Sequence, residues 1–404
     1  MKASESSPRY TGKVRECCNY AVRSAKNFLQ NADAGHRQPG GNGESQLRDM
    51  LKENLNTFCD GNVAEESFRT NQKAYVVSNF LTFILMLIAA ALTILAQFAN
   101  GFASICMIAA LVVSIISLLS FFGAFGGTSK DITVQNLYAV RKPNGDVKRR
   151  VILEANLDAP KKRNISRKSE VILTIINLIG IILILAYEVI SLLDLGGMWD
   201  NVMLSKVLPY ISYPLALVIF IPLVLSRTVS VNSSFPGAAD NLIGAYTACG
   251  ALRYMSEMDL RLENTELCVL LTSGKADKNR GAKAFTKAHA LELGETDTAI
   301  ICLDSIYSTD TLNIVTKGRK FSKFMDEAAE NAGAMVTDHN PKYHKGDWKV
   351  FQKAGVKAAS LTSLPDNEPA FYHSAADNED NLNVRAVEAA INIALEAAYL
   401  KDAD

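Results

Sequence analysis

Four long apolar runs constrain this chain more than any other feature of its sequence. Two of them, Tyr75–Ala96 and Phe102–Phe125, contain no charged residue, and two more follow at Val171–Leu193 and Val207–Ser226. A helix of about 20 residues spans the roughly 30 Å hydrocarbon core of a bilayer. The sequence therefore predicts four transmembrane helices in two hairpins, at 75–125 and 171–226. For each run the alternative is a buried core helix of a soluble domain.

Basic residues predict the orientation of these hairpins. Eleven Lys or Arg lie between the hairpins, from Lys130 to Lys168, whereas the two hairpin tips hold only Lys206. Lys and Arg near membrane spans favour the cytoplasmic side. We therefore expect a multi-pass membrane protein with four spans, whose partner is the lipid bilayer and whose soluble part and two termini are cytoplasmic. Glu188 in the third run has two interpretations, an intramembrane transport residue or a carboxylate that reaches the interface.

Composition limits what the soluble part can be. The 404 residues are 49% hydrophobic, which allows two or three domains, and 42 basic residues balance 42 acidic ones. This neutral balance argues against a nucleic-acid partner. Seven cysteines without paired metal-ligand spacing predict reduced thiols instead of a disulfide framework. The Gly-rich stretch Gln38–Gly43 predicts that residues 1–43 form a flexible N-terminal segment.

Strand-like and helix-like patterns recur through the rest of the chain. Ile132–Val140 and Val151–Ala155 flank a Pro-Asn-Gly turn, which predicts a β-hairpin. The apolar runs Glu266–Thr272 and Thr298–Asp304 predict buried strands. Segments expected to be helical are 44–56, 321–332 and 383–401.

The stretch from Ser233 to Met255 carries the strongest functional signal. Pro236-Gly237 predicts a turn, and Asp240-Asn241 follows at the start of a helix with apolar residues every three or four positions. An Asp at such a position is usually a helix cap. Here, other strand-like runs also end in polar residues, at Asn156-Leu157-Asp158, Ser273-Gly274 and Leu303-Asp304, and Tyr372-His373-Ser374 stands near the end of the chain.

The order and spacing of these residues resemble the di-zinc aminopeptidases, the twenty-eighth metallopeptidase family. Its relatives include glutamate carboxypeptidase II and the transferrin receptor ectodomain. The resemblance implies an α/β fold with a mixed, mostly parallel sheet flanked by helices. That domain would be assembled from 44–74, 126–170 and 227–404. It also implies a cis peptide bond between Asp240 and Asn241.

The resemblance assigns three remnant metal ligands. Asp240 matches the carboxylate that bridges both zinc ions, Asp304 matches a ligand of the first zinc, and His373 matches a ligand of the second. Three other family positions are substituted here: Asn156 replaces a zinc-binding histidine, Lys275 replaces the glutamate general base, and Ala276 replaces a zinc-binding glutamate. The pocket residues implied by the resemblance are Asn156, Asp158, Asn241, Lys275 and Asp347.

These substitutions decide the expected function. Each zinc position has lost one of its three protein ligands, an ammonium group cannot accept a proton, and an alanine cannot bind metal. We therefore expect a pseudopeptidase without a cofactor that binds a peptide, protein or small ligand. One alternative is an active exopeptidase with an atypical zinc site, and another is a subunit of a transporter or membrane complex. Lys275 is expected to pair with Asp240, with Asp304, or with both; the alternative is an exposed lysine on a drifted loop.

Overall fold

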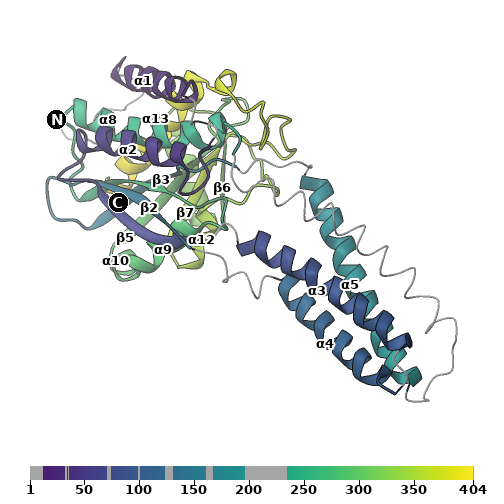
Figure 1. Cartoon of the computed structure of the whole chain (residues 1–404). Helices are drawn as coiled ribbons and strands as arrows, with labels where there is room; N and C mark the ends of the chain where they lie inside the picture. The colour runs from purple at the N-terminus through teal and green to yellow at the C-terminus, as the bar shows by residue number, and fades with distance from the viewer. Residues whose placement is uncertain are drawn as a thin grey trace. The chain divides into compact units, whose positions relative to one another are not determined.

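The chain divides into two compact units, which are each assembled from separate segments. The computed structural model describes residues 12–31, 34, 36–70, 74–98, 101–122, 131–160, 167–195 and 234–403. The α/β unit comprises 1–70, 132–162 and 232–404, and the helical unit comprises 71–131 and 163–231. Figure 1 shows the elements of both units, coloured along the chain.

The α/β unit is built on a seven-stranded sheet. Its strands lie in the order β1-β2-β4-β3-β5-β7-β6. Their bounds are β1 (Ala64–Thr70), β2 (Ile132–Arg141), β3 (Arg149–Asn156), β4 (Thr265–Thr272), β5 (Asp297–Asp304), β6 (Asn313–Thr316) and β7 (Lys357–Thr362). The central strands β4, β3, β5 and β7 are parallel to one another, whereas β1, β2 and β6 join antiparallel. The sheet is mixed, and the expected mostly parallel character holds only for its centre.

The predicted hairpin between the second and third strands is wrong. β2 and β3 follow each other in the chain, but β4 lies between them and pairs antiparallel with β2 and parallel with β3. The turn at Asn144-Gly145 instead bonds to the segment that enters β4, because the backbone N–H groups of both residues donate to the carbonyls of Leu262 and Glu263. A Pro-Asn-Gly turn therefore reverses the chain here without fixing which strand is the neighbour.

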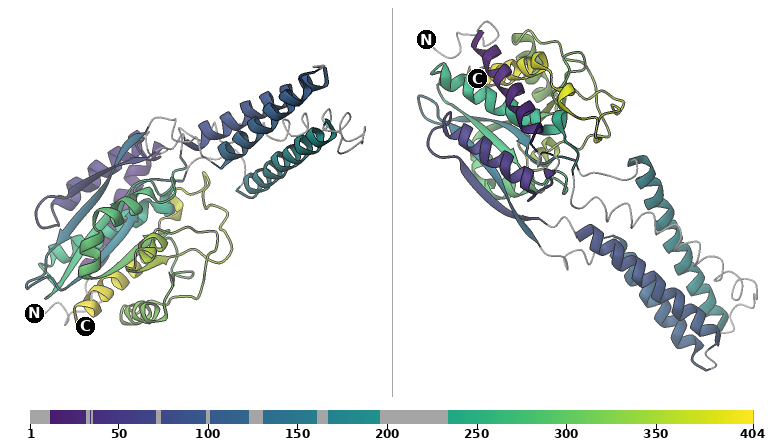
Figure 2. Two further views of the ribbon diagram at one scale, coloured as in Figure 1. Left: turned by 90° about the horizontal axis from the view of Figure 1, so that it is seen from below. Right: turned by 45° about the horizontal axis from the view of Figure 1, so that its top comes forward.

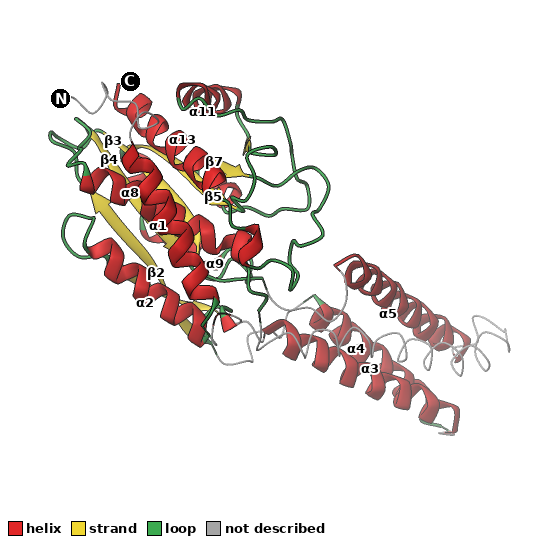
Figure 3. Ribbon diagram, turned by 90° about the horizontal axis from the view of Figure 1, so that it is seen from above, coloured by secondary structure: helices red, strands yellow, loops and turns green. Residues whose placement is uncertain are grey.

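Helices cover both faces of this sheet. Their bounds are α1 (Gly12–Leu29), α2 (Asn42–Asn56), α8 (Ile243–Glu257), α9 (Arg280–Ala288), α10 (Ala290–Glu295), α11 (Arg319–Asn331), α12 (Trp348–Lys353) and α13 (Val384–Ala403). Alternate strand residues point to opposite faces. Val151 and Leu153 join the core under α1, α2, α8, α11 and α13, and Ile152 joins the core under α9, α10 and α12. Figure 3 shows from above the face of the sheet that α1, α2, α8 and α13 cover.

The expectation of a flexible segment over residues 1–43 is wrong where helix α1 forms. Val14, Cys17, Ala21, Ala25 and Phe28 recur at intervals of three and four residues and are all buried. They pack against α8 and α13. This apolar stripe is the ordinary signal of a helix on a core, and the mixed charge of the segment obscured it. All seven cysteines lie in described residues, and none forms a disulfide.

The helical unit contains three long apolar helices in its described part. They are α3 (Ala74–Phe98), α4 (Ala103–Phe121) and α5 (Arg167–Leu195), and α4 packs against both of the others. By length and composition, Ala103–Phe121 and Val171–Leu193 are able to cross a membrane, and Phe80–Ala96 is a shorter apolar stretch. The expected fourth span at 207–226 lies outside the described residues. The two views in Figure 2 show these helices from other directions.

Polar and apolar side chains are distributed unusually in this unit. Residues that face the helix–helix contacts include Thr82, Ser114, Ser117, Asn177 and Glu188, all buried. The Ser114 hydroxyl on α4 donates to the Glu188 carboxylate on α5 at 2.9 Å. Large apolar residues are exposed on all three helices, among them Phe98, Ile105, Ile108, Ile175, Ile179, Ile182 and Leu183. Polar side chains thus lie between the helices beside a small apolar cluster that includes Met86, Phe121 and Ile184, and the outward faces are apolar.

Candidate functional site

The carboxyl ends of three parallel strands bring the predicted site residues together. Asn156 ends β3 and lies in register with Thr272, which ends β4 immediately before the loop that carries Lys275. β5 lies on the other side of β3 and ends at Asp304. Ligand sites of open α/β sheets lie at this edge. The topology therefore gathers the residues that the sequence singled out.

Asp240 lies in the turn before α8 and does not cap the helix. Residues Ala238–Leu242 form a single irregular turn in which Asp240 and Asn241 leave helical geometry, and no side chain caps it. The peptide bond between them is cis, as the resemblance predicted. The Asp377 carboxylate accepts from the backbone N–H groups of Ala239 at 2.7 Å and Asp240 at 3.0 Å. Asp377, which is far away in the sequence, thus holds this turn in place.

Asn241 ties this turn to the ends of β3 and β5. Its side-chain amide donates to the Leu303 carbonyl at 2.7 Å and to Asn156 Oδ1 at 3.2 Å, and its oxygen accepts from the Ser305 N–H at 3.0 Å. Gly244 leaves the room for this arrangement, because a Cβ there would lie 2.3 Å from Asn241 Oδ1. Asn241 is a positioning residue of the site.

Asp158 positions the loop that carries the substituted family residues. Its two carboxylate oxygens accept from the backbone N–H groups of Lys275 at 3.0 Å and Ala276 at 2.8 Å. Burial raises the pKa of the Asp158 carboxyl, although these two hydrogen bonds and the Lys275 charge oppose the rise. The loop after β4 therefore keeps a defined conformation.

The Lys275 ammonium lies in the centre of the site. Its Nζ donates to Asp304 Oδ1 at 2.6 Å and to Asn156 Oδ1 at 3.0 Å. Burial alone would lower the pKa of Lys275, but the surrounding carboxylates, with Asp304 first, outweigh burial and raise it above its usual value. The predicted pairing of Lys275 with Asp304 is confirmed, and the alternative of an exposed lysine is wrong.

His344 is a site residue that sequence analysis missed. Its Nε2 lies 2.7 Å from Asp304 Oδ2, and its Nδ1 shares a hydrogen bond of 3.1 Å with the Tyr372 hydroxyl. Asp304 thus has a partner on each oxygen. Burial opposes ionisation of Asp304, but His344 and Lys275 outweigh it and hold its pKa well below the usual range. No local pattern marks His344; its position three residues before Asp347 was the available signal.

A second carboxylate–histidine pair completes the arrangement. His373 Nε2 lies 2.8 Å from Asp240 Oδ2, and the Ser305 hydroxyl donates to Asp240 Oδ1 at 3.4 Å. Burial opposes ionisation of Asp240, but the hydrogen bond and charge of His373 outweigh it and lower its pKa. Asp240, Asp304 and His373 therefore lie in one site, as the resemblance implied.

Comparison with known proteins identifies the fold at this point. Residues 226–398 match Peptidase family M28. The chain has the fold of that family. The solved structures similar to it include a glutaminyl cyclase from Fimbriiglobus ruber, with 11% identity and a TM-score of 0.55 over 95% of both chains. No match was found among curated proteins.

Aminopeptidases with the M28 fold are similar to the same extent. The aminopeptidase from Aneurinibacillus sp. strain AM-1 has 11% identity and a TM-score of 0.55, over 96% of this chain and 95% of that one. The zinc aminopeptidase BSAP from Bacillus subtilis has 11% identity and a TM-score of 0.54, over 95% of each chain. At this level of identity the likeness establishes the fold, and chemistry has to be argued from the site itself.

The site of this M28-fold chain does not fit a zinc ion. Zinc needs three protein ligands to hold and acidify a water molecule. Among the described residues, no three His, Cys, Asp or Glu side chains are arranged to hold a metal. The Lys275 ammonium already occupies one oxygen of Asp304, His344 faces the other, and His373 pairs with Asp240. A divalent cation would also meet the repulsion of the ammonium at short range.

Three further ionisable residues lie near this centre. Burial raises the pKa of Asp347 to about 6 and raises that of Glu154 well above its usual value, and the Lys275 charge opposes both shifts. Sequence analysis named Asp347 as a pocket residue but missed Glu154. It also missed Arg37, a fully buried guanidinium that donates to the carbonyls of Leu157, Pro236 and Gly237. Arg37 lay in the segment expected to be flexible.

Proposed function

We propose that this chain is a membrane-anchored M28-fold protein that no longer hydrolyses peptides and binds a peptide, protein or small ligand at the former metal site. The observation that carries this proposal is the position of Lys275. Its half-buried ammonium lies 2.6 Å from Asp304, so a side chain of the protein supplies positive charge among the carboxylates. In this proposal the site works without a metal cofactor.

The loss of catalysis follows from the residues after β4. Peptide hydrolysis at such a site requires a base that takes a proton from water, and Lys275 has no lone pair to accept one while it is charged. The surrounding carboxylates raise the pKa of Lys275, which keeps it protonated. Ala276 offers its backbone N–H to Asp158 and no side-chain donor to a metal. An active exopeptidase would therefore lack the general base and the zinc ligand that the loop after β4 would have to supply.

The membrane part of the proposal is supported by the distribution of side chains in the helical unit. Ser114, Ser117 and Glu188 are buried among the helices, and Ile105 and Leu183 are each 62% exposed. In water this arrangement exposes a large apolar surface, whereas in lipid the same surface meets hydrocarbon. We propose that the unit spans the bilayer with four helices, including the run at 207–226, and that both termini and the α/β unit are cytoplasmic.

A transporter or membrane-complex subunit is the remaining alternative, and Glu188 is the residue that such a role would use. Its carboxylate accepts a hydrogen bond from Ser114, which is sufficient to explain a carboxyl group between helices. The structure offers no continuous row of ionisable groups beside it in the described helices. We therefore place function in the α/β unit and an anchoring role in the helical unit.

Restoration of the family residues tests the proposal. The triple substitution Asn156→His, Lys275→Glu and Ala276→Glu returns one ligand to each metal position together with the base. We expect the unmodified full-length chain to show no chelator-sensitive hydrolysis of aminoacyl substrates, and the triple variant to acquire stoichiometric zinc. Chelator-sensitive hydrolysis by the unmodified chain would contradict the proposal. Ala276→Glu alone is the matched control, because it leaves Lys275 in place and is expected to bind no zinc.

A further inference from the structure

A second pocket lies at the amino ends of the parallel strands, whereas the site described above lies at their carboxyl ends. Its volume is about 680 Å³, which is within the range of small-molecule sites of about 300–1,000 Å³. It is formed where β7 begins at Lys357, close to the start of β5, and Asp304 lies at the other end of β5. This pocket is therefore separate from the former metal site.

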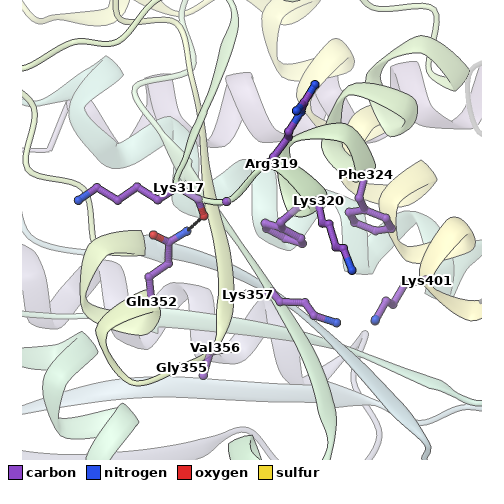
Figure 4. Close-up of a pocket in the computed structure, with 11 residues that line it drawn as sticks. Lys317, Arg319, Lys320, Phe324, Gln352, Gly355, Val356, Lys357 and Lys401 are labelled. Atoms are coloured by element: carbon purple, nitrogen blue, oxygen red, sulfur yellow. Dashed lines mark hydrogen bonds between the residues drawn. The ribbon is translucent and has the colours of Figure 1, made fainter.

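The pocket is lined by an unusual number of basic side chains. The five basic residues that line it are Lys317, Arg319, Lys320, Lys357 and Lys401. They come from the β6–α11 connection, the first turn of α11, the start of β7 and the end of α13. In Figure 4 the side chains of Lys320, Lys357 and Lys401 point toward one region below Phe324, whereas Lys317 and Arg319 point away from it.

The positive charge of this pocket exceeds the negative charge beside it. Asp297 pairs with both Lys357, at 2.7 Å, and Lys401, at 2.5 Å. The carboxylate of Asp402, which follows Lys401 in the chain, accepts from the backbone N–H groups of Glu263 and Asn264. In the part of the chain that the structure describes, Lys320 forms no ion pair. One carboxylate thus serves two lysines, and further cations remain available for an anionic ligand.

The start of helix α11 adds to this positive field. Gly318 precedes the helix with φ of 111°, no side chain caps the first turn, and that turn contains no acidic residue. The free N–H groups and the helix dipole at such a position favour a negative charge. Gln352 fixes the connection, because its side-chain amide donates to the Lys317 carbonyl at 2.9 Å. The helix start is thus held in place beside the lysines.

Two phenylalanines supply an apolar wall to the same pocket. Their rings, those of Phe321 and Phe324, are stacked with centroids 5.5 Å apart and planes at 14°. Phe321 is buried in the core, and Phe324 is only partly buried and lines the pocket. A flat apolar surface beside cations suits a ligand that carries both an anionic group and a flat ring, because aromatic rings stack on such surfaces.

We propose that this pocket binds a phosphorylated small molecule with a flat ring, which is the chemistry of a nucleotide. Phosphate oxygens accept several charge-assisted hydrogen bonds at once, and Lys320, Lys357 and Lys401 provide ammonium donors from three elements. The ring lies against Phe324. The proposal is independent of the function proposed for the former metal site, since no residue is shared between the two.

Calorimetric titration of the full-length chain in detergent micelles tests the proposal, with ADP as the probe at low salt. We expect ADP to bind, and both adenosine, which lacks phosphate, and inorganic phosphate, which lacks the ring, to bind at least about tenfold more weakly, a difference of about 1.4 kcal/mol. Binding is expected to weaken as salt rises. Absence of ADP binding at millimolar concentration would overturn the proposal. Equal binding of inositol phosphates, as lipid-headgroup analogues, would overturn the assignment to a nucleotide.

Matched variants of α11 locate the binding. Lys320→Ala removes a pocket cation and is expected to weaken ADP binding about tenfold. Lys323→Ala removes the same charge from an exposed position on the same helix that does not line the pocket, and it is expected to leave binding unchanged. Phe324→Leu is expected to reduce the preference for ADP over inorganic phosphate. Equal weakening by Lys320→Ala and Lys323→Ala, with unchanged thermal stability, would show a nonspecific charge effect and contradict the proposed site.

Discussion

Lys275 in the α/β unit is a half-buried ionisable side chain and Glu188 in the helical unit is a buried one, and their surroundings differ. Lys275 lies among carboxylates and pairs with Asp304, whereas Glu188 meets the hydroxyl of Ser114. Both units have buried apolar clusters, but the three described helices of the helical unit also expose many large apolar residues. A buried charge in a water-surrounded core is stabilised by a countercharge. Hydrogen bonds between polar side chains of apolar-coated helices are a common pattern in membrane proteins.

The largest effect is expected from removing the central countercharge of the α/β unit. Lys275→Met removes the ammonium partner of the buried Asp304 carboxylate, which then keeps only His344, and is expected to lower the free energy of unfolding by about 3 kcal/mol, the lower end of the range for breaking a buried pair. Urea denaturation followed by Trp348 fluorescence in a Trp199→Phe background measures this. Lys287→Met, at an exposed position on α9, is the control and is expected to change stability by less than about 0.5 kcal/mol. If both variants changed the free energy of unfolding by the same small amount, Lys275 would not be the countercharge that stabilises Asp304.

The next test concerns the outer face of the helical unit. Ile179→Lys places a charge on an exposed apolar face of α5, which in lipid costs about 2.5–3.5 kcal/mol and reduces membrane integration. Leu291→Lys makes the same kind of change on the exposed surface of α10 and is expected to be neutral. The fraction of each variant that resists alkaline extraction from membranes measures the difference. An unaffected Ile179→Lys variant would contradict contact between this face and lipid.

A pH-dependent effect sharpens the comparison within the α/β unit. Glu44, in the first turn of α2, is buried, and burial raises the pKa of its carboxyl to about 7, although the Gly40 N–H donates to it. A raised folded pKa contributes stability below the unfolded value, and this stability is lost as pH rises through about 7. Glu44→Gln is expected to remove this decline, of roughly 2–3 kcal/mol, between pH 4.5 and 7. Denaturation curves across this range measure it, and parallel curves for both proteins would contradict the expected burial effect.

The smallest effect is expected in the interior of the helical unit. Ser114→Ala removes the hydrogen bond to Glu188, and such bonds between membrane helices contribute about 0.6 kcal/mol on average. Unfolding of the full-length chain in mixed micelles measures the loss. If Ser114→Ala cost as much as Lys275→Met, the contrast between the two units would fail.

Local patterns in the sequence predicted the strand ends and the turn of the site, and the family resemblance implied which of their residues lie together, but some contacts between distant segments escaped both. The strand ends at Asn156 and Asp304 and the turn at Asp240 were predicted because short apolar runs followed by polar residues are local signals. His344 contacts Asp304 from 40 positions away, and Arg37 reaches the carbonyl of Gly237 across 200 positions. No periodicity reports such pairs. The order of β2, β4 and β3 was missed for the same reason.

The most direct test of the account is the zinc content of the unmodified full-length chain after dialysis against excess zinc and passage through a desalting column. Elemental analysis is expected to find no stoichiometric zinc, because the Lys275 ammonium lies against Asp304 and no complete set of three ligands remains among the described residues. One or more zinc ions per chain, lost when Asp240 and Asp304 are both changed to Asn, would contradict the claim that Lys275 takes the place of the metal.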